Sequence, residues 1–179
     1  MLENASMEAA PDANSPPLVD PTEDVCRLCF SAKFPVFRAS GRNTQIDDTT
    51  GMIRLEEIAW KDLAESGFSL QRRSLYSLAD AQAEAERRNT DKSGKRGEDV
   101  GYRLDGVLIA QVASINAIVD PAGGQVFRVL ATPKDGAPAH AEVRIGPAYA
   151  RHEFLRHRDD LRRVLGQLRA PAALDMPQD

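Results

Sequence analysis

Cysteine, aromatic residues and long apolar runs are all scarce in this sequence. Two cysteines among 179 residues are too few for a disulfide-rich secreted scaffold, and aromatic residues make up only 6% of the chain. No run of about 18 apolar residues is present, and the N-terminus does not combine a basic stretch with an apolar one as a secretory signal does. These absences exclude a membrane-spanning protein and favour the reducing cytoplasm as its location.

What the sequence does contain is the composition of one ordinary globular domain. Hydrophobic residues make up 42% of the chain, and 23 basic against 27 acidic side chains leave a net charge of -4. A chain of this length buries roughly 70% of its extended-chain surface on folding, which suffices for one core. We therefore predict a single α+β domain, with a mixed or mostly antiparallel sheet of about five strands and two or three helices.

The charge is unevenly distributed, because residues 1–25 contain six acidic side chains and no Lys or Arg. The remaining residues hold 23 basic and 21 acidic side chains, so the body of the chain is faintly basic. Prolines among Ala, Asn and Ser leave the N-terminal segment little apolar surface to bury. We predict a disordered acidic leader over 1–22, a domain over 23–170 and, after Pro171, a disordered tail over 171–179.

Hydrophobic periodicity predicts the elements of the domain. Short apolar or alternating runs predict strands at 25–30, 34–38, 68–72, 125–132 and 140–145. Helical spacing predicts a short amphipathic helix over 54–65, and a capping box at Ser77 opens a second helix to about Arg88, followed by a polar loop over 89–99. Residues 107–119, the most apolar stretch, favour a strand and a turn, with a helix as the alternative.

The strongest pattern is a predicted helix over 149–169. Its apolar side chains fall within one wedge of the helix surface, which indicates that this face packs on a core. One flank carries four arginines: Arg151, Arg158, Arg162 and Arg169. Such a basic flank predicts binding of phosphates or of an acidic partner. The alternative is that the arginines cover the edge of the core with their alkyl stems and hold their charges in water.

A second basic cluster lies between residues 87 and 97, where Asp91 is the only acid. It consists of Arg87, Arg88, Lys92, Lys95 and Arg96. One interpretation is that this cluster, together with Arg72 and Arg73, holds a nucleic-acid backbone. A solvated loop is the other interpretation, because the whole chain is acidic and no aromatic stacking platform for single-stranded nucleic acid is visible.

The string Pro-Ala-His-Ala-Glu over 138–142 resembles the His-Ala-Glu box of the zinc-dependent nucleobase deaminases. The resemblance implies that His140 binds zinc and that Glu142 transfers protons to and from an activated water. That family completes its metal site with a downstream Pro-Cys-x-x-Cys, whereas here no cysteine follows position 29 and the local pattern is that of a strand. A polar edge at the start of a strand is the alternative interpretation.

Cys26 and Cys29 form a Cys-x-x-Cys motif near the start of the domain. In the zinc hypothesis they join His140 as metal ligands, and a set with His152 and His157 is a further arrangement. Residues three apart in a strand face opposite sides of the sheet, and histidines five apart on a helix point in different directions. The pattern therefore favours two buried, reduced cysteines and predicts no cofactor.

The strand Phe-Ser-x-x-Arg over 68–72 and the 138–142 string together resemble a group of small bacterial α+β proteins with no assigned activity. The resemblance implies a bacterial, cytosolic protein and nothing about mechanism. The sequence also lacks a Gly-x-Ser-x-Gly elbow, a phosphate-binding P-loop and a dinucleotide-binding glycine motif. We therefore predict a non-enzymatic interaction or accessory module of a protein complex. A nucleic-acid-binding protein and a zinc-dependent, deaminase-like enzyme are the two alternatives.

Overall fold

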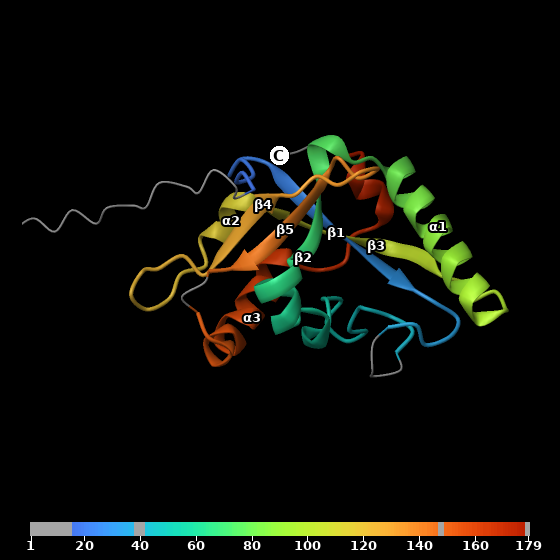
Figure 1. The fold of residues 1–179 in the computed structure, drawn as a ribbon, viewed down its shortest axis with the longest axis horizontal. Helices are drawn as coiled ribbons and strands as arrows, with labels where there is room; N and C mark the ends of the chain where they lie inside the picture. Colours follow the sequence, from blue (N-terminus) through green and yellow to red (C-terminus); the bar gives the residue numbers. More distant parts are fainter. Residues whose placement is uncertain (1–15, 38–41, 147–148, 178–179) are drawn as a thin grey trace, which may run out of the picture.

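A five-stranded antiparallel sheet forms the centre of the fold (Figure 1). The computed structural model describes residues 16–37, 42–146 and 149–177. The strands lie in the order β3-β1-β2-β5-β4, and every neighbouring pair is antiparallel. Their bounds are β1 Asp24–Ser31, β2 Phe68–Arg72, β3 Arg103–Gln111, β4 Phe127–Ala131 and β5 His140–Ile145. The predicted α+β class with a five-stranded sheet is confirmed.

Three α-helices and four short helical turns accompany the sheet. The helices are α1 Leu78–Arg96, α2 Val112–Asn116 and α3 Arg151–Leu165, and the turns are η1 Leu55–Glu57, η2 Asp62–Ser66, η3 Arg73–Leu75 and η4 Pro171–Leu174. α1 lies beside β3, and α3 packs on the opposite face of the sheet (Figure 1). α1 begins with the predicted capping box, in which Ser77 and Asp80 each bond the other's backbone N–H.

One face of the sheet is covered along its length and forms the larger core. Side chains of α3 share one core cluster there with side chains of β2, β4 and β5, and the contributing residues include Phe154, Leu161, Leu165, Phe68, Leu70, Val129 and Val143. Alternation along each strand places the apolar residues of β2 and β5 on this one face. Burying each of these large side chains contributes about 1.5–3 kcal/mol to stability, so this face is the main source of folding energy.

On the opposite face, the helical segments of the described residues pack over β1 and β3. There α1 and η4 pack Ala81, Ala85 and Leu174 against Cys26, Leu28 and Ile109. Over β2 and β5 the same face carries Ser69, Gln71, His140, Glu142 and Arg144 instead. We call this second part the polar half-face.

α1 continues to Arg96, through most of the segment that was predicted as a loop over 89–99. Its polar residues accept hydrogen bonds from the chain that follows: Asn89 Oδ1 from the Tyr102 N–H at 2.7 Å, and Ser93 Oγ from the Val100 N–H at 3.1 Å. Gly97 then ends the helix with a φ of 80°. The loop prediction is therefore wrong up to Arg96, because composition does not reveal these tertiary bonds.

Two further predicted elements are wrong. The segment 54–65 forms η1 and then η2 instead of one continuous helix, although its apolar residues Ile58 and Leu63 are fully buried. Over the described part of 34–38, Phe37 forms only an isolated bridge with Arg42. Pro35 has no N–H to donate to a strand ladder, which accounts for the missing strand.

The apolar stretch 107–119 was predicted as a strand and a turn or as a helix, and it contains a strand followed by a helix. β3 ends at Gln111, and α2 begins at the next residue. Val107 and Ile109 pack on the α1 side of the sheet, whereas Leu108 and Ala110 pack on the α3 side. Because both faces of β3 are covered, its sequence shows a continuous apolar run and no alternation.

Both terminal segments are more ordered than the sequence indicates. The Val19 N–H donates to Val129 O at 3.0 Å and the Ala131 N–H donates to Pro17 O at 2.8 Å, so residues 16–19 run along β4. At the other end Ala173 and Leu174 of η4 are buried. These contacts lie within 16–22 and 171–177 of the predicted leader and tail, while 1–15 and 178–179 lie outside the described residues.

The C-terminal helix is shorter than the predicted 149–169. α3 ends at Leu165, and Gly166 turns the chain with a φ of 72°. The following segment is extended, and Arg169 exchanges two backbone hydrogen bonds with Val107 of β3, at 2.8 and 3.0 Å. Arg169 therefore leaves the helix and lies beside the edge strand of the sheet.

Gly67, at the start of β2, is required by its neighbour Glu142. It has a φ of 78°, and a Cβ added there would lie 2.3 Å from Glu142 Oε2. We expect Gly67→Ala to lower the free energy of unfolding by at least about 2 kcal/mol in urea denaturation, from backbone strain and displacement of the carboxylate. Gly94→Ala is the matched control, since Gly94 is helical with nothing within 4 Å, and should raise stability by up to about 1 kcal/mol. Equal effects of the two substitutions would contradict this account of Gly67.

Candidate functional site

The polar half-face brings together two strings that the sequence analysis singled out. In the antiparallel register of β2 and β5, Ser69 pairs with Glu142 and Gln71 pairs with His140. Paired residues of adjacent strands face the same side, so all four side chains lie on the polar half-face. Lys134, from the β4–β5 connection, reaches the same place. We call Ser69, Lys134, His140, Glu142 and Arg144 the strand-face cluster.

The Glu142 carboxylate lies at the centre of the strand-face cluster. It is buried, with 3% of its surface exposed, and a buried carboxylate is unstable without compensating charge. Arg144 Nη2 donates to Glu142 Oε2 at 2.8 Å, and Lys134 Nζ donates to Glu142 Oε1 at 3.2 Å. Two cations therefore balance one buried anion, which leaves the group with a positive charge.

His140 is held by the loop on one side and faces Ser69 on the other. Its Nδ1 lies 3.0 Å from Thr132 O, and its Nε2 lies 3.4 Å from Ser69 Oγ and 3.2 Å from Lys134 Nζ. Burial lowers the pKa of His140 below its usual value of 6.5; the Thr132 carbonyl and Glu142 raise it, and the Lys134 charge lowers it. A neutral ring with its proton on Nδ1 satisfies these contacts, and its Nε2 is then a hydrogen-bond acceptor.

A small groove of about 220 Å³ adjoins Ser69, where α1 meets the polar half-face. Arg27, Gln71 and Arg88 line it together with Ser69. Arg27 spans the gap where β1 and β2 diverge, because its Nη1 donates to Ser69 O at 2.7 Å and its guanidinium lies 4.4 Å from the centre of the Phe68 ring. The groove is thus polar and carries arginine at two of its walls.

The cysteines of the zinc hypothesis face opposite sides of the sheet, as the odd spacing predicted. Cys26 packs on the α1 side and Cys29 on the α3 side, and burial raises the pKa of each thiol to about 12. Gln71 lies between Cys26 and His140 in the strand register. Among the described residues, no three His, Cys, Asp or Glu side chains are grouped in a way that would hold a metal ion.

Of the predicted arginine flank, Arg151, Arg158 and Arg162 lie on α3 and Arg169 does not. Arg158 lies over the Phe154 ring at 5.8 Å, Arg162 donates to Thr50 Oγ1 at 3.0 Å, and Arg151 is exposed at the helix start. Arg169 lies beyond the helix, as described above. The extended chain after Gly166 removes the helical geometry on which the four-arginine alignment depended.

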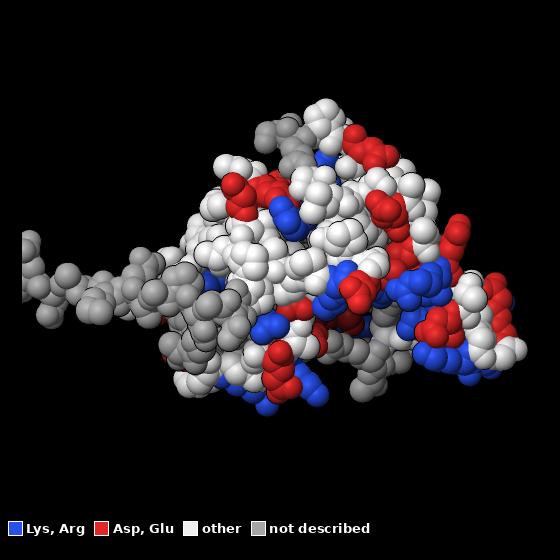
Figure 2. All heavy atoms as spheres, turned by 45° about the horizontal axis from the view of Figure 1, so that its top comes forward, with Lys and Arg blue, Asp and Glu red and all other residues white. Residues whose placement is uncertain are grey.

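The basic cluster of residues 87–96 lies on α1 and is largely paired with acids. Glu84 accepts hydrogen bonds from both Arg87 and Arg88, and Lys95 and Arg96 bond Asp91 and Glu98. Lys92 lies over the Tyr102 ring at 5.2 Å. Figure 2 shows basic and acidic side chains interleaved over the end of the molecule that α1 occupies. Arg72 and Arg73 are paired as well, with Glu23 and Asp24.

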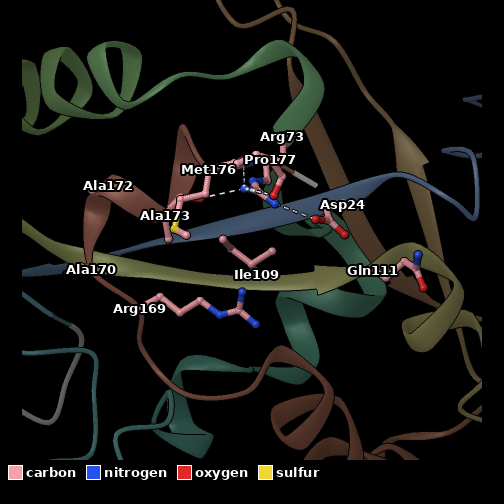
Figure 3. A pocket seen from close by; sticks show the side chains of 10 residues that line it. All are labelled: Asp24, Arg73, Ile109, Gln111, Arg169, Ala170, Ala172, Ala173, Met176 and Pro177. Carbon is pink, nitrogen blue, oxygen red and sulfur yellow. Dashed lines mark hydrogen bonds and ion pairs between the residues drawn. The ribbon is translucent and has the colours of Figure 1, made fainter. Parts of the chain in front are cut away.

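A second candidate site is a cavity of about 680 Å³ at the end of β3, under the C-terminal segment (Figure 3). We call it the C-terminal cavity. Ile109, Ala172, Ala173 and Met176 supply apolar surface, and Asp24, Arg73, Gln111 and Arg169 supply polar groups. It lies on the same face of the sheet as the strand-face cluster, where α1 and η4 leave β3 uncovered.

Arg73 holds the C-terminal cavity together. Its side chain is 5% exposed, Nη1 donates to Asp24 Oδ2 at 2.8 Å, and Nη2 donates to the backbone oxygens of Ala173 and Met176. Arg169 differs from it, because its exposed guanidinium has no hydrogen-bond or ion-pair partner among the described residues. The cavity therefore has one neutralised arginine in its wall and one available arginine at its rim.

Comparisons with known proteins assign neither site: no protein-family model matches the chain, and neither the curated proteins nor the solved structures contain a match. In the described part of the chain, no helix has both the length and the apolar character needed to cross a bilayer.

Sequence reasoning identified His140, Glu142 and Arg169 but missed their neighbours. Ser69 lies 71 residues before His140, and only the strand register brings them together. Arg73 was considered only as part of a nucleic-acid surface, and Asp24 was missed, because their pairing depends on carbonyl groups of the C-terminal segment, which was predicted to be disordered. The one available signal for Ser69 was its place in an alternating strand, on the side opposite to the apolar residues.

The lowered pKa of His140 predicts a specific loss of stability in mild acid. Below pH 6.5 the unfolded ring takes up a proton before the folded ring does, so the free energy of unfolding should fall as pH decreases from 7.5 to 5.5. Urea denaturation of His140→Gln should show a smaller decrease over this range, because glutamine does not titrate. His152→Gln, at an exposed position of α3, should keep the full decrease. An identical pH profile for wild type and His140→Gln would contradict the account.

Proposed function

We propose that the protein is an interaction module that binds an acidic segment of a protein partner in the C-terminal cavity. The observation that carries this proposal is the Arg169 guanidinium, which has no ion-pair partner among the described residues and lies at the rim of a cavity with partly apolar walls. A bacterial cytosolic complex is the setting that we propose for it, on the strength of the sequence resemblance.

Size and chemistry support a short peptide segment as the occupant. The volume of about 680 Å³ lies within the range of roughly 300–1,000 Å³ that is typical of ligand-binding cavities. Ile109 and Met176 offer contacts to an apolar side chain, while Arg169 offers a planar pair of donors that suits a carboxylate. An acidic residue next to an apolar one matches both parts of the cavity.

The charge of the cavity favours an anionic occupant. Asp24 neutralises Arg73 through the 2.8 Å ion pair, and no acidic side chain of the described residues pairs with Arg169. Complementary charge increases the rate of encounter and sets the orientation of the bound segment. A cationic segment would instead meet Arg169 at close range.

The walls of the C-terminal cavity are already in place, which lowers the entropic cost of binding. Arg73 fixes residues 173–176 from one side, and the paired backbone bonds between Arg169 and Val107 fix the other end of the same segment. Met176, a lining residue that is 63% exposed, adds apolar contact surface at the edge of the cavity. Exposed apolar groups beside a cavity are a common feature of protein-binding surfaces.

Binding can be tested with a fluorescein-labelled hexapeptide of alternating Leu and Glu, monitored by fluorescence anisotropy. We expect Arg169→Ala to weaken binding about tenfold, because it removes the donors for the carboxylate. The matched control is Arg151→Ala, which removes an exposed arginine that does not line the cavity and should leave the affinity unchanged.

A second peptide with Gln in place of Glu separates carboxylate recognition from apolar contact, and it should bind more weakly than the Glu peptide. The affinity of the Glu peptide should also decrease as salt screens the interaction. Equal affinities of the Arg169→Ala and Arg151→Ala variants, or of the two peptides, would overturn the proposed function.

A further inference from the structure

The strand-face cluster contains an exposed hydroxyl next to a neutral imidazole, and the proposed partner cavity uses neither of them. We propose that Ser69 and His140 form a nucleophile and general-base pair that hydrolyses small acyl esters. This activity is separate from partner binding, since neither residue lines the C-terminal cavity.

The geometry of the imidazole suits a general base. Nδ1 lies 3.0 Å from the Thr132 carbonyl oxygen and 2.9 Å from the Thr132 hydroxyl, and both contacts orient the ring. Because the Lys134 ammonium, 3.2 Å from Nε2, can only donate, the arrangement favours the proton on Nδ1. Nε2 is therefore the basic atom, and it lies 3.4 Å from Ser69 Oγ, within hydrogen-bond reach. His140 itself is buried, with 7% of its surface exposed, while Ser69 is exposed and open to substrate.

A cation lies where negative charge would develop. Lys134 Nζ is 3.2 Å from His140 Nε2 and 3.2 Å from Glu142 Oε1, so Glu142 keeps the ammonium beside the reacting atoms. The Lys134 side chain is 57% exposed and has room to move from Nε2 to the carbonyl oxygen of a bound ester. There it would stabilise the oxyanion of the tetrahedral intermediate.

The groove beside Ser69 indicates the class of substrate. Its volume of about 220 Å³ admits only a small group, and Arg27, Gln71 and Arg88 give it polar walls. A short acyl ester of a polar alcohol fits this space, with the alcohol in the groove and the acyl carbon at Ser69. Large apolar acyl chains do not match the lining.

The reaction balances with water as the second reactant. Ser69 Oγ attacks the acyl carbon while its proton passes to His140 Nε2, and the departing alkoxide oxygen then takes that proton as the carbon–oxygen bond breaks. In the second half, water gives a proton to His140 and adds to the acyl carbon. The carboxylic acid leaves, and Ser69 Oγ regains its proton from His140.

A fluorophosphonate probe tests the proposal directly, because fluoride leaves as an Oγ–phosphorus bond forms. We expect intact-mass spectrometry of the full chain to show one adduct, and peptide mapping to place it on Ser69. Ser69→Ala should abolish labelling, and His140→Gln should slow it by about 100-fold or more. Ser66→Ala, at an exposed serine three residues upstream, should label at the wild-type rate.

Hydrolysis of p-nitrophenyl acetate provides the second readout and should follow the same order among the variants. Circular dichroism and thermal unfolding of Ser69→Ala establish that the fold is intact, since an exposed hydroxyl contributes little to stability. Arg169→Ala should retain full labelling, which distinguishes this proposal from the partner-binding function. A wild-type chain that is not labelled, or Ser69→Ala labelled as fast as wild type, would overturn the proposal.

Discussion

The incomplete cover of one sheet face is the constraint on which the rest of the structure depends. An isolated sheet must bury apolar surface on at least one face, and the α3 side meets this need along all of β2, β4 and β5. On the other side α1 and η4 reach only β1 and β3. Both candidate sites lie at the margin of that cover: the C-terminal cavity at the end of β3, and the strand-face cluster beyond β1.

Beyond the margin, a buried ionic group takes the place of apolar packing. Glu142 is as buried as a core residue, and it is stable there because Arg144 and Lys134 supply opposite charge and Gly67 leaves space for its side chain. The same group links β5 to the β4–β5 connection through Lys134. This connection also provides Thr132, whose carbonyl contacts His140. The same connection therefore supplies both the Lys134 charge beside Glu142 and the contact that orients the imidazole.

The sequence predicts most of the sheet because its apolar residues follow strand periodicity. β1, β2, β4 and β5 were expected within two residues of their observed bounds, and the opposite facing of Cys26 and Cys29 followed from their spacing alone. The beginning of α1 was also predictable, since the capping box is a local interaction between Ser77 and Asp80. Local physical rules are sufficient for these features.

The remaining features depend on contacts between distant residues. The extension of α1 to Arg96, the ordering of 171–177 by Arg73 and the approach of Ser69 to His140 each join segments that no local pattern connects. His140 and Glu142 were identified from the 138–142 string, which resembles a zinc-binding motif. In the described residues no metal-binding group forms around them, so the string did not predict which side chains surround them. The register of β2 against β5 supplies that grouping, because it places Ser69 beside the ring.

The central claim is that His140 is a neutral ring whose unprotonated Nε2 faces Ser69 and Lys134 on the polar half-face. A long-range ¹H–¹⁵N correlation spectrum of the histidine-labelled protein at pH 7 tests this most directly, with His140→Gln used to assign the signals. The account predicts a proton on Nδ1 and none on Nε2, as the hydrogen bond to Thr132 O requires. A proton on Nε2, either in the other neutral tautomer or in a charged imidazolium, would contradict it.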